Sequence, residues 1–418
     1  MHESQGRSRQ PEPRQAAAQS AFSAGLLAYA CMLGLAVYLM TVENSYAPMR
    51  PEMAADLGLS QVQSAFISSA FLIGFALMQL PAGALLDRLG PARLVAPMAL
   101  VTGLSCLILA SSQGVVGLTA GRLLMGAAAS FVCPAIASVT RMGLPLALFA
   151  MLMGISEMSI GVGGVAGVWG GNELQAATHW RVVMWIAAAA SVPVAALCWW
   201  LVPARLFGPA APVEADGHDF LSTLKQLLAD RNVRLASLIY AGGCGTLCGF
   251  GGMWNIELAK AWRYHESQAI LVGSAFFVGI AIGSPLVGWL ANRFGSRATL
   301  LAALWLALPA FVFWIAVPAD LPMWFDALNV ALIGAALSSS ALAFDIAGHG
   351  LAPQRVASAV AVVSLSGVAA GAVLEILPGL IAHKISGLPL HELQWANSVF
   401  PLMVLVTLWA VSRVGGKD

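Results

Sequence analysis

Long apolar runs, separated by short polar segments, constrain this chain more than any other feature. Twelve such runs occur, and each approaches the length of about 20 residues that an α-helix needs to cross a bilayer. Only 10% of the 418 residues are charged and 59% are hydrophobic, whereas a soluble domain has about 25% charged residues. The sequence therefore predicts an all-α membrane protein with twelve transmembrane helices.

The expected spans divide into two groups of six. They cover residues 22–43, 61–86, 93–112, 116–139, 145–169 and 182–203, and then 234–257, 268–291, 298–317, 323–345, 356–380 and 396–412. The polar segment 204–233 predicts a cytoplasmic linker between an N-terminal bundle (22–203) and a C-terminal bundle (234–413). Within the linker, FLSTLKQLLADR has the spacing of a helix on the membrane surface. Residues 1–21 predict a disordered cytoplasmic tail, and residues 414–418 predict a second, short tail.

The distribution of Lys and Arg predicts the orientation. If the N-terminus is cytoplasmic, the inner segments hold fifteen Lys and Arg residues. The outer segments then hold five, which are Arg50, Arg181, Lys260, Arg263 and Lys384. Positive residues are retained on the cytoplasmic side of a membrane. This bias predicts a multi-pass protein of the cytoplasmic (inner) membrane with both termini inside.

Two predicted inner turns repeat one another. GALLDRLGPAR follows the second span and GWLANRFGSR follows the eighth. In each turn, a first Gly permits close helix contact. An acid or amide and an Arg follow, which can bond helix ends and loops. A second Gly then permits a tight turn. The repeated positions, with the Arg that ends each turn, are Gly83, Asp87, Arg88, Gly90 and Arg93, and then Gly288, Asn292, Arg293, Gly295 and Arg297.

With these turns the chain resembles the major facilitator superfamily over residues 22 to 412. GRLLMGAAAS, from Gly121 to Ser130, resembles the family's fourth-span motif, and HWRVVMWI resembles its entry to span 6. The resemblance implies a monomeric transporter of a small solute, in which two six-helix bundles rock about a central site. It also implies that Asp87, Arg88 and Arg93 hold an inward gate shut, while Asn292 weakens the second copy.

Five ionisable residues lie inside the expected spans or at their outer ends: Arg122, Glu157, Glu375, Glu43 and Glu257. Each costs about 2.5–3.5 kcal/mol to insert at a span's centre, so such residues are functional candidates. At 1.5 Å per residue, Glu157 lies roughly 20 Å into its span, near the bilayer midplane, and Arg122 about 9 Å below the outer surface. We predict that these five residues bind substrate or couple its movement to protons.

Two of these residues leave alternatives open. Glu157, in MGISEMSIGVGG, either locks two helices together with neighbouring serines, or acts as a proton carrier or substrate contact. Burial favours the neutral form of an acid, which suits a proton carrier. Arg122 keeps its proton, so it either pairs with Glu43 or Glu157, or binds a substrate carboxylate.

A row of glycines follows Glu157. Gly163, Gly167 and Gly171 recur every four residues, with Gly164 beside them. Small residues at this spacing let helices approach closely. The row predicts either permanent packing between spans or a sliding surface during gating.

Metal ions, cofactors and nucleic acids are not expected. All seven histidines lie outside the spans, and the formal net charge is only +1. Cys244 and Cys248 are four residues apart, but no His or acid is near enough in sequence to complete a metal site. No nucleophile–base pair or phosphate loop occurs in the cytoplasmic segments, so a membrane enzyme or a transporter-like receptor is disfavoured.

Two transport functions remain. The run APMRPEMAADLGLSQVQSAFISSAF resembles anion and organic-acid symporters of the superfamily, which favours proton-coupled uptake of a small organic anion or metabolite. The alternative is proton-driven efflux of a drug or metabolite. The span-5 stretch SIGVGGVAG lacks the Gly-Pro pair of drug antiporters, which counts against efflux.

Overall fold

The computed structural model describes residues 13–145, 148–208, 220–262, 264–316, 321–348, 353–382 and 390–415. These residues form helices and the turns between them, with no strand in the described part of the chain. Eleven described helical stretches are long and apolar enough to cross a bilayer. The continuous helical stretch Phe149–Ala177 supplies a twelfth, so the predicted all-α membrane fold is confirmed.

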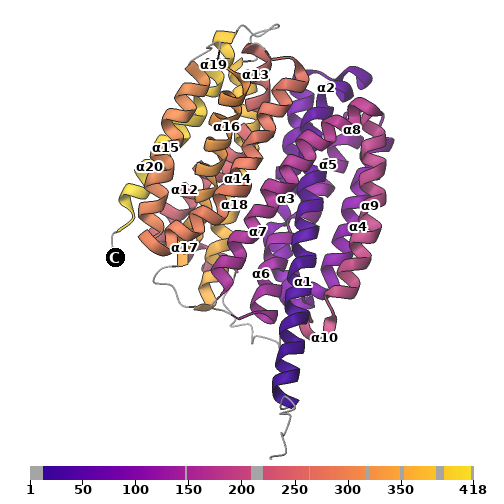
Figure 1. Ribbon diagram of the computed structural model, residues 1–418, viewed down its shortest axis with the longest axis vertical. Helices are drawn as coiled ribbons and strands as arrows, with labels where there is room; N and C mark the ends of the chain where they lie inside the picture. Colours follow the sequence, from indigo (N-terminus) through magenta and orange to yellow (C-terminus); the bar gives the residue numbers. More distant parts are fainter. Residues whose placement is uncertain are drawn as a thin grey trace, which may run out of the picture.

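The chain folds as two bundles that stand side by side, the first indigo to magenta and the second orange to yellow (Figure 1). The N-terminal bundle contains α1 (Pro13–Asn44), α2 (Tyr46–Leu57), α3 (Gln61–Leu89), α4 (Pro91–Ser111), α5 (Val115–Ala129), α6 (Val132–Gly143), α7 (Phe149–Val165), η2 (Ala166–Gly170), α8 (Gly171–Ala177) and α9 (Trp180–Leu201). Two short helices follow, α10 (Ala204–Phe207) and α11 (Phe220–Ala229).

The C-terminal bundle repeats the plan of six crossings. It contains α12 (Arg231–Thr246), η3 (Leu247–Trp254), α13 (Asn255–Trp262), α14 (Glu266–Phe294), α15 (Ser296–Ala316), α16 (Met323–Leu337), η4 (Ser338–Leu342), α17 (Ala343–Gly348), α18 (Pro353–Ala382), α19 (Leu390–Asn397) and α20 (Val399–Arg413). Several crossings are interrupted, and both η2 and η3 are π-helical. Such local widening of a helix is frequent at functional sites.

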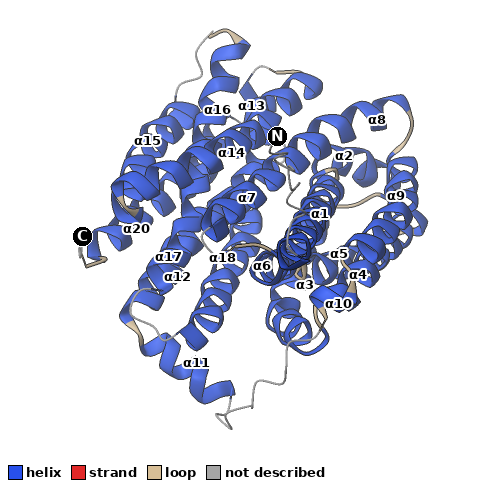
Figure 2. Cartoon of the chain, turned by 60° about the horizontal axis from the view of Figure 1, so that its bottom comes forward, coloured by secondary structure: helices blue, strands red, loops and turns tan. Residues whose placement is uncertain are grey.

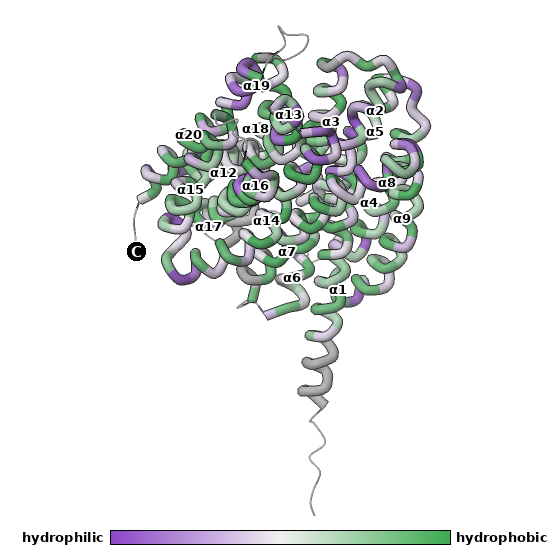
Figure 3. The backbone as a smooth tube through the Cα atoms, turned by 45° about the horizontal axis from the view of Figure 1, so that its top comes forward, coloured by the Kyte–Doolittle hydropathy of each residue, from purple (hydrophilic) through white to green (hydrophobic). Residues whose placement is uncertain are grey.

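The molecule has two polar ends and an apolar waist. α2, α8, α13 and α19 lie at one end, which is the predicted outer side (Figure 1), and polar colours gather there (Figure 3). α10 and α11 lie at the opposite, predicted inner side (Figure 2). Large apolar side chains along the waist are exposed, including Leu104, Trp200 and Trp305. Lipid tails are the natural solvent of such a surface, and helices satisfy their own backbone within it.

The structure corrects the predicted helix ends. Helix α1 begins at Pro13, so residues 13–21 of the predicted disordered tail are helical, while residues 1–12 lie outside the described residues. Helix α2 lies between the first two expected spans, in a segment for which no helix was predicted, and it contains Pro51. In the linker, α11 coincides with FLSTLKQLLADR, and residues 209–219 lie outside the described part.

The two repeated turns are built alike. Gly90 and Gly295 have positive φ angles of 75° and 84°, a region that glycine enters at little cost, so the predicted tight turns are confirmed. An added Cβ at Gly83 or Gly288 would have no atom within 4 Å. The close helix contact predicted at these two glycines is therefore not made in this structure.

Glycines on α3 and α5 set the distance between these helices. An added Cβ at Gly74 would overlap the backbone of Leu123, and one at Gly126 would overlap the backbone of Phe71. Small residues let transmembrane helices pack backbone to backbone. This close approach brings Arg122 of α5 against the backbone of α3.

Gly126→Val should therefore lower stability much more than Gly34→Val. The added side chain would force α3 and α5 apart, and overpacking costs about 1–3 kcal/mol or more. An added Cβ at Gly34 meets nothing within 4 Å, which makes it the matched control. Thermal unfolding of both purified variants in detergent measures the difference, and equal melting temperatures would contradict the close packing.

Candidate functional site

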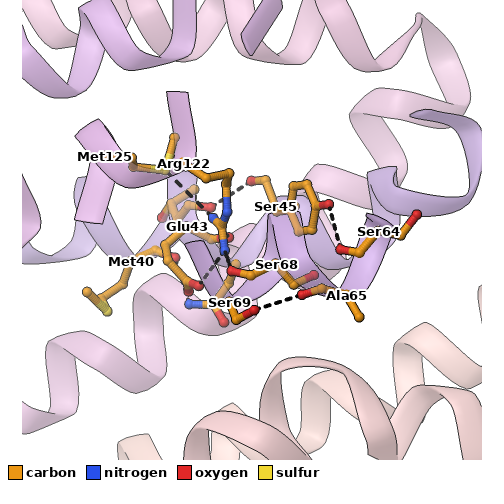
Figure 4. A network of polar contacts seen from close by, with 12 residues as sticks. Met40, Glu43, Ser45, Ser64, Ala65, Ser68, Ser69, Arg122 and Met125 are labelled. Atoms are coloured by element: carbon orange, nitrogen blue, oxygen red, sulfur yellow. Dashed lines mark hydrogen bonds and ion pairs between the residues drawn. The ribbon is translucent and has the colours of Figure 1, made fainter. Parts of the chain in front are cut away.

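Arg122 is the most deeply buried charged side chain of the expected site, with 2% of its surface exposed. Its guanidinium donates to the backbone oxygen of Ser68 at 3.1 Å and to that of Glu43 at 3.5 Å. The rings of Tyr46 and Phe71 lie 4.5 and 4.9 Å from it. Carbonyl oxygens and aromatic faces thus surround the charge, and the Glu43 carboxylate lies at a longer distance (Figure 4).

Glu43, at the end of α1, is the nearest carboxylate to this guanidinium. Its Oε1 lies 3.4 Å from Nη2 of Arg122, longer than the 2.7–2.9 Å of a strong charge-assisted hydrogen bond. Of the two partners considered for Arg122, the fold supplies Glu43, and Glu157 is not among its contacts. The ion pair is loose, so the guanidinium retains capacity for another anion.

Glu375 reaches the same place from the other bundle. It lies on α18, is 7% exposed, and is within electrostatic range of Arg122, Glu43 and Arg50. Its Oε2 atom is buried and has no hydrogen-bond partner among the described residues. The indole of Trp254 in η3 donates to the backbone oxygen of Glu375 at 3.0 Å, which fixes this part of α18. The carboxyl oxygen Oε2 is therefore available to bind a proton.

These side chains line one small cavity between the bundles, which we call the interbundle cavity. Its wall consists of Glu43, Asn44, Tyr46, Ala47, Arg50, Ser68, Arg122, Gly252, Met253 and Glu375. The residues come from α1, α2, α3 and α5 on one side and from η3 and α18 on the other. Gly252 adds no side chain to the wall in front of Glu375. The cavity therefore brings charged side chains of both bundles together in one place.

Arg50 was missed as a site residue in the sequence and counted only as an outer-loop charge. It lies on α2 and forms an ion pair with Glu257 on α13, across the two bundles. Lys260 lies 3.9 Å from the same Glu257 oxygen and 2.7 Å from Glu266. Glu257, predicted as a coupling residue, is thus a partner of Arg50 at the outer edge of the interbundle cavity.

Contacts with α9 fix the position of α2. The indole of Trp180 donates to Asp56 at 3.1 Å and its backbone N–H donates to Glu52 at 3.2 Å. Arg181 also pairs with Asp56, and the His179 imidazole lies 3.3 Å from Glu52. The HWR sequence therefore anchors α2, which carries both Tyr46 and Arg50, to its own bundle.

Glu157 lies apart from this cavity. It is partly exposed on α7, and it is within electrostatic range of Cys133 and Tyr240. No hydrogen bond or ion pair joins its side chain to a described residue. Its neighbour Ser156 bonds instead to the backbone of Leu152 at 2.9 Å and contacts the Tyr29 hydroxyl at 3.1 Å. The helix-locking role considered for Glu157 is thus filled by Ser156.

The gating-motif side chains lie on the predicted inner side. Arg93, Asn292, Arg293 and Arg297 are exposed, and the side chains of Asp87 and Arg88 lie outside those described. Arg297 donates to the backbone oxygen of Ser412 at 3.3 Å. The gating role of these residues stays a prediction. Among the described residues, no group of three or more His, Cys, Asp or Glu side chains is placed to hold a metal ion.

A family comparison agrees with the two-bundle architecture. The sequence model of the Major Facilitator Superfamily matches residues 26–256, more than half of the chain. The chain belongs to this superfamily. Its members are membrane transport proteins rather than enzymes, and typically act as monomers on small molecules.

Individual relatives are more distant. A gallate transporter of Pseudomonas putida is 26% identical over 277 residues, which are 58% of this chain and 60% of that protein. The match thus spans less than two thirds of the relative's length. Among solved structures, an inward-facing bacterial homologue of the human lysosomal transporter Spinster has a TM-score of 0.71 at 14% identity, covering 97% of this chain and 98% of that one.

Two further structures share the fold. A variant of the nucleoside transporter NupG has a TM-score of 0.73 at 13% identity, covering 93% of this chain and all of that one. FucP in its outward conformation has a TM-score of 0.69 at 15% identity, covering 94% of this chain and all of that one. At these identities the similarity defines the fold alone.

Glu157→Gln should leave thermal stability nearly unchanged, within about 0.5 kcal/mol, because the carboxylate forms no hydrogen bond or ion pair with the described residues that the amide would lose. Tyr29→Phe is the matched comparison near the same helix. It removes the 2.5 Å hydrogen bond from the Tyr29 hydroxyl to the Leu152 oxygen and should cost about 1 kcal/mol. Melting curves of both variants test this, and a larger loss in Glu157→Gln would restore a structural role for Glu157.

Proposed function

We propose that this protein is a proton-coupled symporter that moves a small organic anion inward across the cytoplasmic membrane by alternating access. One chain supplies both bundles, so the working unit is a monomer, with both termini in the cytoplasm. The observation that carries the proposal is the interbundle cavity. There two guanidinium groups of one bundle line the same cavity as Glu375 from the other, whose Oε2 atom has no hydrogen-bond partner among the described residues.

The charges around the cavity favour coupling an anion to a proton. Arg50 and Arg122 supply two positive charges, and Glu43, Glu257 and Glu375 supply three negative charges when all are ionised. An anion that binds alone would add a further negative charge in a medium of low dielectric constant, which is costly. An anion that binds together with a proton on Glu375 adds no net charge. Joint binding is therefore favoured over separate binding.

In this proposal Arg122 binds the substrate carboxylate. A guanidinium can hold a carboxylate through two parallel hydrogen bonds, and the present contact with Glu43, at 3.4 Å, is long enough to be exchanged. Glu375 accepts the coupled proton, because it has no competing partner in the cavity. Tyr46 and Phe71 face the Arg122 guanidinium and keep water from it.

The gallate transporter supports the substrate class. Gallate is an aromatic carboxylate, and it has the single negative charge that the proposed exchange with Glu43 requires. The match of 26% identity covers 58% of the chain, so gallate serves as a first test compound for small organic acids.

Proton-driven efflux is the second candidate, and Glu157 favours it. This acid has no bonded partner among the described residues and lies near Tyr240 and Cys133. A carboxylate beside an aromatic ring suits a lipophilic cation. Efflux would then place the proton and the cation at Glu157 rather than in the interbundle cavity.

Uptake of radiolabelled gallate into proteoliposomes, driven by an inward proton gradient, tests the main proposal. Arg122→Gln should lower uptake about tenfold or more, because a charge-assisted hydrogen bond is worth about 1.5–3 kcal/mol. Arg231→Gln is the control, since Arg231 is exposed at the start of α12 and donates to the backbone oxygen of Arg413, away from the cavity. Equal uptake by the wild type and Arg122→Gln would contradict an anion site at Arg122.

Glu375→Gln should separate transport from proton coupling. The neutral amide mimics the protonated acid, so exchange of internal for external gallate should continue while accumulation driven by the proton gradient is lost. Glu157→Gln should retain both activities. If instead Glu157→Gln abolishes coupling, and vesicles transport lipophilic cations but not gallate or other small carboxylates, the efflux reading replaces uptake.

A further inference from the structure

The two bundles are joined on the outer side by a single ion pair among the described residues. Arg50 of α2 meets Glu257 of α13, and the two side chains are only 17% and 26% exposed. Arg50 lines the interbundle cavity and also a second small cavity on its outer side, together with Glu257 and Lys260. The pair therefore lies between the interbundle cavity and the outer surface.

A second contact between the bundles lies along α7 and α14. An added Cβ at Gly161 would overlap the backbone of Phe277 and Ala281, and one at Gly164 would overlap the Phe277 ring. α7 belongs to the N-terminal bundle and α14 to the C-terminal bundle, and they pack closely. The absence of side chains at these two glycines is what permits this approach. We call the pair Gly161 and Gly164 the glycine seam.

Neighbouring glycines face a different way. An added Cβ at Gly163 would meet Met40 and Val37 of α1, and one at Gly167 would meet Thr41 of the same helix. These contacts lie within the N-terminal bundle, which moves as one body if the bundles rock. The glycine row predicted from the sequence thus supplies permanent packing. The glycine seam lies one or two residues from Gly163 along α7. It forms the surface at which α7 and α14 must separate if the bundles rock.

We propose that the Arg50–Glu257 pair and the glycine seam together form the outer gate of the transporter, which is closed in this structure. Opening the interbundle cavity to the outside requires breaking the ion pair and moving α7 away from α14. Glu257 then controls the equilibrium between outward-open and outward-closed states, and does not bind the substrate. This role is independent of which substrate is carried.

The charge at the gate explains why a salt bridge suits this position. Both side chains are partly exposed, so each can be solvated when the bundles separate, and a partly exposed pair is only weakly stabilising. A weak contact lets both states be populated. Lys260 pairs with Glu266 on its own bundle, so it does not substitute for Arg50 across the interface.

Hydrogen–deuterium exchange of the intact protein in lipid nanodiscs tests the gate without labels or a known ligand. In Glu257→Gln we expect exchange several-fold faster in outer-side peptides of α7 and α14 (residues 158–170 and 266–277). Peptides that contain the inner turns at Gly90 and Gly295 should exchange more slowly. A gate gives this opposite change at the two ends, because closing one side accompanies opening the other. Mere loosening of the structure speeds exchange at both ends.

Four further variants complete the test. The charge reversal Arg50→Glu with Glu257→Arg should return exchange to the wild-type pattern. Glu52→Gln removes a pair with His179 inside one bundle, and its exchange should match that of the wild type at both the outer and the inner ends. Gly164→Val should reproduce the outward-open pattern, whereas Gly163→Val should not.

The proposal is overturned if Glu257→Gln leaves exchange unchanged at the outer ends, or accelerates it equally at both ends. Should Gly164→Val fail to fold, Glu257→Gln and its charge-reversed partner still decide the outcome. If the wild type does not transport gallate but Glu257→Gln shows the expected opposite changes in exchange at the two ends, the proposed substrate is refuted and the gate is supported.

Discussion

The burial of one positive charge, that of Arg122, determines how this end of the molecule is built. A guanidinium remains protonated in a protein, so the surrounding helices must supply acceptors in a medium that has few. Glycines on α3 and α5 bring the Ser68 carbonyl within 3.1 Å, and the end of α1 supplies Glu43. These acceptors balance the positive charge of Arg122 only in part. Arg122 is therefore suited to binding an exchangeable anion.

The C-terminal bundle places a buried acid against the same cavity that holds Arg122. Glu375 is a buried acid whose second oxygen has no partner among the described residues, so this oxygen is available to take up a proton when an anion enters the cavity. A cavity that holds a loosely paired cation on one side and an unpaired acid on the other favours an anion and a proton together. Alternating access then needs only that the Arg50–Glu257 pair and the α7–α14 contact form and break as the bundles rock.

Much of the fold could be predicted from the sequence, because apolar length defines spans and φ-positive glycines define turns, as at Gly90 and Gly295. The sequence also offered Glu43 as one partner of Arg122, and the structure places the two side chains 3.4 Å apart. Contacts between bundles could not be predicted, since Arg50 and Glu257 are 207 residues apart and no helix was predicted for the segment that forms α2. Depth likewise placed Glu157 near the midplane but could not give its rotation, which depends on packing.

The central claim is that anion binding is linked to protonation of Glu375. Calorimetric titration of the purified protein with gallate, in buffers of different ionisation enthalpy, counts the protons taken up per bound anion. The account predicts uptake of about one proton in the wild type and none in Glu375→Gln, by linkage of binding to protonation. Equal proton uptake by both proteins, or gallate binding without any proton uptake, would contradict it.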